Sequence, residues 1–179
     1  MYWYILFVFT GQEYKVEQIL KKQMYADASI PFVPMLEVIY KISGRIKKET
    51  KPLFPGYVFI ESGVPSLKFI NMMCRVVFFS QDIIRILKYA DTGEIAIRES
   101  EKRMLLRLCN NERCIESSTG IIEGDSVYIK EGPLKGLESI VKKIDRHKRR
   151  AFIELEFMGE VRQVSLALVL DIVEKKWNV

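Results

Sequence analysis

Five short runs of β-forming residues crowd into the last third of the chain, and this crowding restricts the possible folds more than any other feature. In the third run, Ile153, Leu155 and Phe157 alternate with two glutamates, as in a strand with one buried face. Met158-Gly159-Glu160 follows this run directly and is typical of a hairpin turn. Short strands at such close spacing favour a small all-β barrel, because closure removes exposed sheet edges. The predicted strands are residues 126–129, 139–144, 151–157, 161–166 and 170–174.

The first 110 residues have a different pattern, in which strands and helices alternate. Residues 2–9 are aromatic or aliphatic throughout, which predicts a strand buried on both faces. Residues 13–25 carry apolar side chains at helical spacing, which predicts an amphipathic helix. Further strands are predicted at residues 36–42, 57–61 and 75–79, and a hairpin with a basic tip follows the first of these three. Two further helices are predicted at residues 65–74 and 99–110. This order predicts an α+β domain, an antiparallel sheet with helices packed on it.

A polar stretch separates the two patterns. Residues 110–120 end in Ser117-Ser118-Thr119-Gly120 and contain few apolar side chains, which is typical of a linker. We therefore predict one domain at residues 1–110, a linker at residues 111–121 and a second domain at residues 122–179.

The positive charge is concentrated in two segments. The chain has 28 Lys and Arg against 23 Asp and Glu, a net charge of +5. Residues 41–51 carry +4 and residues 142–150 carry +5, so the rest of the chain is at −4. Local basic patches on a mildly acidic body indicate a polyanionic partner. For residues 41–51, a solvated hairpin tip explains the charge equally well. For residues 142–150 we favour a phosphate-binding role, because mutual repulsion of so many cations needs compensation.

The sequence offers little that could support catalysis. Cys74, Cys109 and Cys114 lack metal-ligand spacing, and His147 is the sole histidine. We find no Gly-rich phosphate loop and no histidine placed beside a nucleophile and an acid, so we expect no enzyme, no cofactor and no metal site. The longest apolar run has eight residues, far below the roughly 20 of a membrane-spanning helix, and we expect a cytoplasmic protein that binds no membrane.

Two segments resemble known modules. Glu123-Gly124-Asp125, Glu131-Gly132-Pro133 and Gly136, with apolar residues between and after them, closely resemble the KOW motif of small SH3-like barrels. Trp3-Tyr4 in the first strand and the segment KPLFPGYVFIE at residues 51–61 resemble the N-terminal domain of NusG-family transcription elongation factors. Both matches occur in the family's order. One departure is Arg75-Val76-Val77, where many members have Arg-Gly-Val.

The resemblance implies the partners of the first domain. NusG-like N-terminal domains bind the clamp helices of bacterial RNA polymerase through aromatic side chains, and core packing is the alternative for each aromatic residue. The positions that match are Phe7, Phe54, Tyr57, Phe59 and Phe78. The family also contacts non-template DNA, for which Gln12, Lys15 and Arg75 are the nearest equivalents.

The basic turn at residues 146–150 resembles the specialised LoaP-type members, which recognise RNA. An RNA hairpin presents closely spaced phosphates that a basic loop can follow. The predicted RNA-binding residues are Lys135, Lys142, Lys143, Arg146, His147, Lys148, Arg149, Arg150 and Arg162. We therefore expect a monomeric antitermination factor that reads a nascent RNA hairpin. The alternative is a general elongation factor that couples polymerase to Rho or to a ribosomal protein through the turn at residues 157–160. In that case Phe157 is the candidate apolar contact, and packing inside the barrel is the other use expected of its ring.

Overall fold

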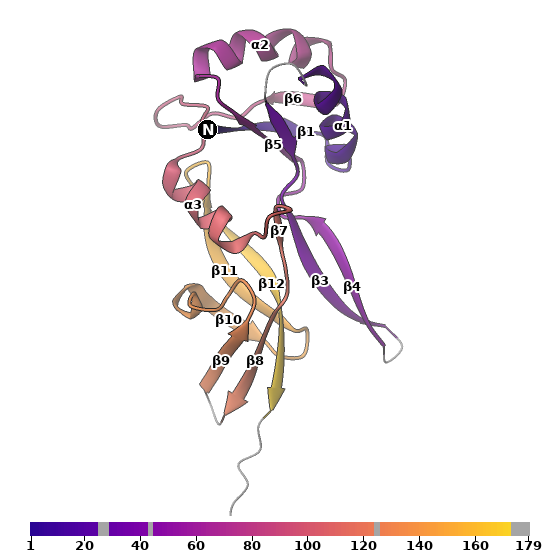
Figure 1. Cartoon of the computed structure of the whole chain (residues 1–179), viewed down its shortest axis with the longest axis vertical. Helices are drawn as coiled ribbons and strands as arrows, with labels where there is room; N and C mark the ends of the chain where they lie inside the picture. Colours follow the sequence, from indigo (N-terminus) through magenta and orange to yellow (C-terminus); the bar gives the residue numbers. More distant parts are fainter. Residues whose placement is uncertain (25–28, 43–44, 124–125, 173–179) are drawn as a thin grey trace, which may run out of the picture. The chain divides into compact units, whose positions relative to one another are not determined.

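The computed structural model describes residues 1–24, 29–42, 45–123 and 126–172 and divides into two compact units (Figure 1). Unit 1 comprises Met1–Pro34, Pro52–Leu105 and Glu156–Glu160. Unit 2 comprises Met35–Lys51, Leu106–Leu155 and the chain from Val161 onward. The units are therefore not two consecutive halves of the sequence. The linear domain bounds 1–110 and 122–179 stay a prediction.

Unit 1 is built on a four-stranded sheet with the order β2-β5-β1-β6. Its strands are β1 (Tyr2–Val8), β2 (Ile30–Phe32), β5 (Tyr57–Ser62) and β6 (Ile83–Ile86). β1 pairs antiparallel with both β5 and β6, and Tyr4, Ile5 and Leu6 are fully buried in it. The continuous apolar run at the start of the chain is thus a central strand, as predicted.

The described residues of this region include three α-helices: α1 (Glu13–Gln23), α2 (Ser66–Phe79) and α3 (Glu99–Leu108), of which α3 continues into unit 2. α2 packs on β1, where the rings of Phe69 and Tyr4 stack with centroids 3.8 Å apart. α1 buries Val16 and Leu20, four residues apart on one helix face. These contacts give the α+β class expected from the sequence.

One predicted strand of this unit is wrong. Residues 75–79 form the last part of α2, and the strand lies further on, at β6. Phe69, Met73 and Val76 follow helical spacing, so the helical pattern extends past the β-branched and aromatic residues that favoured a strand. After the helix, the hydroxyl of Ser80 accepts hydrogen bonds from the backbone N–H groups of Asp82 and Ile83. In consequence Phe78 and Phe79 lie at an exposed helix end.

A five-stranded sheet accounts for most of unit 2 and has the order β10-β11-β12-β8-β9. The strands are β8 (Ser118–Glu123), β9 (Ser126–Glu131), β10 (Val141–Asp145), β11 (Arg150–Phe157) and β12 (Glu160–Ile172). β12 pairs parallel with β8, whereas β10 with β11 and β8 with β9 pair antiparallel. The small all-β class is confirmed.

Three details of that sheet differ from prediction. The strand predicted at residues 139–144 begins only at Val141, because Glu138–Ile140 form a short 3-10 helix. The predicted strands at 161–166 and 170–174 are one long strand, β12, and residues 173–174 lie outside the described part. β8 was not predicted, because its first residues are Ser118, Thr119 and Gly120. Gly120 permits a close strand contact, since a Cβ there would lie 2.4 Å from the carbonyl oxygen of Tyr128.

A basic hairpin belongs to unit 2 as well. β3 (Met35–Ile42) and β4 (Arg45–Pro52) form a three-stranded sheet with β7 (Cys114–Ile115), in the order β4-β3-β7. The predicted hairpin is therefore present, although its turn at residues 43–44 lies outside the described residues, as do Gly124 and Asp125 of the KOW-like segment. The predicted linker at 111–121 contains β7 and the start of β8.

Candidate functional site

Four aromatic side chains predicted to bind polymerase cluster at one end of the sheet in unit 1. Phe7 and Tyr57 are register partners on β1 and β5, with ring centroids 5.3 Å apart. Tyr57 and Phe59 are two apart on β5, and the rings of Phe59 and Phe54 stack at 6.4 Å. We call Phe7, Phe54, Tyr57 and Phe59 the aromatic surface. Phe78 is not part of it: it lies on α2, is 82% exposed and contacts the ring of Phe79.

The aromatic surface is covered by the turn between β11 and β12, residues 157–160, which also belongs to unit 1. The ring of Phe157 lies 4.2 Å from that of Phe54, 5.0 Å from that of Tyr57 and 6.1 Å from that of Phe59. Phe157, Phe59 and Phe54 are almost completely buried. Phe157, the candidate contact for Rho or a ribosomal protein, is therefore packed against the aromatic surface.

A buried carboxyl group holds the backbone of this turn. Glu101 of α3 is only 2% exposed, and its side chain accepts hydrogen bonds from the backbone N–H groups of Met158 and Gly159, at 3.0 and 3.1 Å. It also accepts a hydrogen bond from the Tyr89 hydroxyl at 2.9 Å. Burial raises the pKa of Tyr89 above its ordinary value, so this hydroxyl keeps its proton and donates. Glu101 thus fastens the turn at the point where it covers the aromatic surface.

Glu101 and Tyr89 are not among the residues predicted from the sequence. One signal was available: Glu101, Leu105 and Leu108 are spaced i, i+4 and i+7, so a carboxylate occupies the apolar stripe of α3. A carboxylate at such a position needs buried donors, which the turn and Tyr89 provide.

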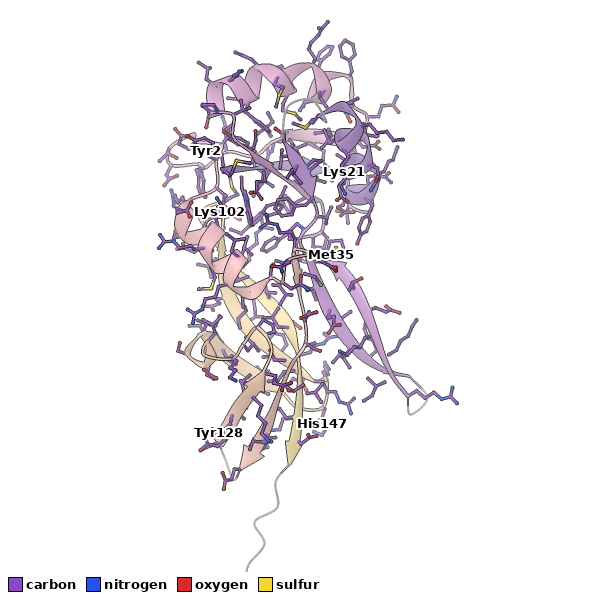
Figure 2. All side chains as sticks on the ribbon, viewed as in Figure 1. Tyr2, Lys21, Met35, Lys102, Tyr128 and His147 are labelled. Carbon is purple, nitrogen blue, oxygen red and sulfur yellow. The ribbon has the colours of Figure 1, made fainter. Side chains whose placement is uncertain are left out.

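The predicted RNA-binding residues Arg146–Arg150 form the turn between β10 and β11, which we call the basic turn; Figure 2 labels His147 on it. Asp145 organises the turn by accepting a hydrogen bond from the backbone N–H of Lys148 at 2.9 Å, and this bond lowers the pKa of Asp145. Arg149 has a φ of 52° and donates its backbone N–H to Arg146 at 3.3 Å.

The cations of the basic turn are available to a ligand. Arg146, His147 and Lys148 are exposed, and Arg149 and Arg150 are half-buried. Within the described part of the chain, no ion pair engages these five side chains. Unpaired cations gathered on one turn are the electrostatic pattern of a phosphate-binding surface.

The other predicted RNA-binding residues are placed less favourably. Lys142 lies 3.5 Å from the carboxylate of Glu154, so its charge is partly balanced. Lys143 is exposed on β10, opposite Phe152, and Arg162 is half-buried on β12 with a partner of its own. Lys135 lies in the loop after β9, whose Gly136 carbonyl accepts a hydrogen bond from Arg107.

β3 supplies residues beside the basic turn that were not predicted. A hollow of about 230 Å³ is lined by Ile39 and Tyr40 of β3 and by His147, Lys148, Arg149 and Arg150. All of them belong to unit 2. Tyr40 was not predicted as a site residue. β3 joins unit 2 by pairing with β7, and this pairing has no local signature in the sequence.

The predicted DNA-binding residues lie around α1 and α2. Gln12 directly precedes α1, and Lys15 forms an ion pair with Asp82 at 2.7 Å. Arg75 lines a hollow of about 480 Å³ whose other walls include Val16, Ile19, Phe79 and Asp82. The structure therefore brings Arg75 and the Lys15–Asp82 pair to the same part of unit 1, with the charge of Lys15 already compensated.

Two further features are absent from the described residues. Among them, no three His, Cys, Asp or Glu side chains form a group able to hold a metal ion. None of the helices in the described ranges has the length and apolar character needed to cross a bilayer.

Comparison with known proteins agrees with this architecture of an α+β module and a small β module. The family model described as transcription termination factor NusG matches residues 1–106, more than half of the chain, and the KOW motif matches residues 123–156. The transcription termination/antitermination protein NusG of Pasteurella multocida is 27% identical over 172 residues, covering 92% of this chain and 90% of that protein. The protein of the same description from Haemophilus influenzae is 25% identical over 174 residues, covering 92% and 89%.

A solved structure of Thermotoga maritima NusG is similar with a TM-score of 0.47 and 21% identity, covering 93% of each chain. The two family matches, and not this structure, define the class of protein: a NusG-type segment at residues 1–106 followed by a KOW motif at residues 123–156. The chain belongs to the NusG family.

Proposed function

We propose that this chain is a specialised transcription elongation factor that binds RNA polymerase and promotes processive antitermination of selected operons. In this proposal the aromatic surface binds the polymerase clamp helices, and the basic turn binds a hairpin in the nascent RNA. The single observation that carries it is the basic turn, whose Arg146–Arg150 side chains have no ion-pair partner within the described residues. A factor that couples proteins only to proteins does not need such a turn.

The aromatic surface supports the polymerase role by its chemistry. Aromatic side chains on an apolar surface are frequent anchors for a partner helix. Phe157 occupies this surface at ring distances of 4.2 to 6.1 Å, so a partner helix would have to displace it. We infer that polymerase binding requires the turn at residues 157–160 to leave the aromatic surface. The same movement would expose Phe157 to a second partner.

The RNA role has a quantitative consequence. The turn carries four permanent cations, Arg146, Lys148, Arg149 and Arg150. If each neutralises one phosphate, the logarithm of the affinity falls with the logarithm of the salt concentration with a slope of about −3.

The test replaces two of these cations. Arg149→Ala combined with Arg150→Ala should weaken RNA binding several-fold and reduce the salt slope by about 1.5, while polymerase binding is unchanged. The matched control combines Arg103→Ala with Lys130→Ala, two exposed cations on other elements with no ion pair among the described residues. Equal loss of RNA and polymerase binding in the Arg149/Arg150 variant would refute the assignment of the two partners to separate surfaces.

The general elongation factor is the alternative function. Crosslinking of the tagged protein to RNA in cells, followed by sequencing of the bound fragments, separates the two. Sharp peaks in a few leader regions near hairpins support the specialised factor. A weak signal spread over all transcripts contradicts it and indicates a general factor whose basic turn is a non-specific tether.

A further inference from the structure

The hollow beside the basic turn has walls of two kinds. Tyr40 contributes an aromatic ring from β3, while His147, Arg149 and Arg150 contribute an imidazole and two guanidinium groups from the basic turn. Each of these groups is flat and can stack on a nucleobase, and the guanidinium groups also bind phosphate. None of the lining residues carries a carboxylate. The hollow is therefore suited to a ligand that combines a planar ring with negative charge.

Two backbone N–H groups of the basic turn are already used in hydrogen bonds within the protein. The backbone N–H of Lys148 is used by Asp145, and that of Arg149 is used by the carbonyl of Arg146. The carbonyl of Arg149 accepts a hydrogen bond from the backbone N–H of Leu168 on β12, which ties the turn to the sheet. A ligand thus meets a turn that is already held in shape, which lowers the entropic cost of binding.

The size of the hollow selects the ligand. Its volume of about 230 Å³ is below the roughly 300–1,000 Å³ of most small-molecule sites, so it has room for one base and not for a stack or a helix. Paired bases are held inside a duplex and cannot enter such a site, whereas an unpaired base can be splayed out onto an aromatic side chain.

Resting on the proposed RNA-binding function, we propose that this hollow binds one unpaired nucleotide of the RNA. Its base stacks on Tyr40, and its phosphates contact Arg149 and Arg150. The RNA is then recognised at a loop or bulge next to its paired stem. Double-stranded RNA alone would contact only the outer cations of the turn.

The strand β4 extends the basic rim of this site. Lys51 on β4 places its Nζ 5.0 Å from the centre of the Tyr40 ring. Lys47 and Lys48 are instead paired with Glu49 at 2.7 Å and Glu37 at 3.3 Å. Residues 41–51 were interpreted either as a surface for a polyanionic partner or as a solvated hairpin tip. The position of Lys51 favours the first interpretation, with Lys51 as the main contact to the RNA.

The experiment uses the full chain and three labelled RNA probes: a hairpin with an unpaired loop, a single-stranded oligonucleotide of ten residues and a fully paired duplex of the same length as the stem. Tyr40→Leu keeps an apolar side chain but removes the ring, and Tyr40→Phe keeps the ring. Tyr40→Leu should weaken binding of the hairpin and the single strand by about 5- to 150-fold, the range for one stacked base. Duplex binding and the salt slope should stay unchanged, and Tyr40→Phe should bind all three probes like the unmodified chain.

A spectroscopic readout tests the stacking directly. The fluorescence of 2-aminopurine placed in the unpaired loop should be quenched on binding to the unmodified chain and to Tyr40→Phe, and not on binding to Tyr40→Leu. Thermal unfolding of both variants checks that the fold is retained. If Tyr40→Leu unfolds early, Tyr40→Ile replaces it: isoleucine also lacks a ring and suits the strand β3, and this variant should likewise show no quenching.

The outcomes separate this site from the RNA-binding function on which it rests. Unchanged RNA binding in the Arg149→Ala/Arg150→Ala variant overturns both. Loss in that variant with full binding by Tyr40→Leu overturns the nucleotide site alone. Equal weakening of duplex and single strand by Tyr40→Leu also overturns it, because stacking of an unpaired base cannot produce that result. Tighter binding of a single-stranded DNA of the same sequence overturns the assignment to RNA.

Discussion

Replacing Glu101 by glutamine tests how the turn at residues 157–160 controls the aromatic surface. One oxygen of Glu101 accepts hydrogen bonds from Tyr89 and Met158, and the other accepts one from Gly159. Glutamine has one acceptor oxygen, and its NH2 group would face a donor in place of the second oxygen. At least one hydrogen bond to a buried carboxylate is therefore lost, which costs about 2 kcal/mol.

The lost hydrogen bond destabilises the state in which the turn covers the aromatic surface, relative to the state in which that surface is uncovered. A change of about 2 kcal/mol shifts an equilibrium roughly 30-fold, so the population with an uncovered surface should rise by about that factor while it is still the minor state. The apparent affinity for RNA polymerase should then rise up to about 30-fold. Titration of labelled polymerase with each variant measures this, and hydrogen exchange of the amides of Met158 and Gly159 reports the release of the turn.

The control is Glu99→Gln, which removes the same charge from the exposed first turn of α3 and should leave both measurements unchanged. Faster exchange in Glu101→Gln with no gain in polymerase affinity would show that the turn does not restrict access, and the reasoning would be refuted. Weaker polymerase binding would show instead that Glu101 or the turn itself is part of the contact.

Three further predictions follow from single residues. Tyr57→Ala should impair polymerase binding and leave the RNA affinity unchanged, measured by pull-down and RNA titration on the same folded sample; loss of RNA affinity would contradict it. The pKa of Asp145 is lowered in the fold, so its contribution to the turn is present above its unfolded pKa of about 4 and is lost as pH falls through the lower folded value. Amide exchange at Lys148, measured at pH 7, should be slow in the unmodified chain and faster in Asp145→Asn, whose turn is loosened; equal exchange rates would contradict this role of Asp145. Gly159→Ala should destabilise unit 1 by about 1–2 kcal/mol in chemical unfolding, because φ is +81° and the new Cβ would lie 3.3 Å from the Tyr89 ring; unchanged stability would show that the turn adapts.

The elements that the sequence predicted well are those with a strong local pattern. β1 is a continuous apolar run, α1 has apolar side chains at helical spacing, and β11 alternates apolar and polar residues. The structure has each of these elements near the predicted position. β8 was missed because Ser118, Thr119 and Gly120 are polar or small, although Ser118 and Gly120 are buried. The helix α2 was ended too early because Val76, Val77 and Phe78 also suit a strand, and packing of Phe69 and Met73 decided for a helix.

The candidate sites divide in the same way. The basic turn is a contiguous run of residues, so composition alone located it, and the hairpin pattern placed it between two strands. Phe157 contacts Phe54, and Tyr40 lies beside residues 147–150, so both have partners about 100 residues away in the sequence. Such long-range contacts leave no local pattern from which they could be predicted. The two uses expected of Phe157 were packing inside the barrel and contact with a partner protein. The local sequence does not indicate that its ring would lie against Phe54 and Tyr57.

The different accessibility of the two surfaces implies an order of binding under the proposed function. The cations of the basic turn are free of ion pairs in the described residues and need no rearrangement to meet RNA. Phe54 and Phe59 are almost completely buried, so polymerase binding must first displace Phe157 and the hydrogen bonds of Glu101. RNA binding would then come first, and it would raise the local concentration of the chain near the polymerase that is making that RNA. A chain recruited in this way can tolerate a covered aromatic surface, because the higher local concentration compensates for the free energy of uncovering it. The covered surface, in turn, would disfavour binding to polymerases whose transcripts lack the hairpin, which is the selectivity expected of an operon-specific factor.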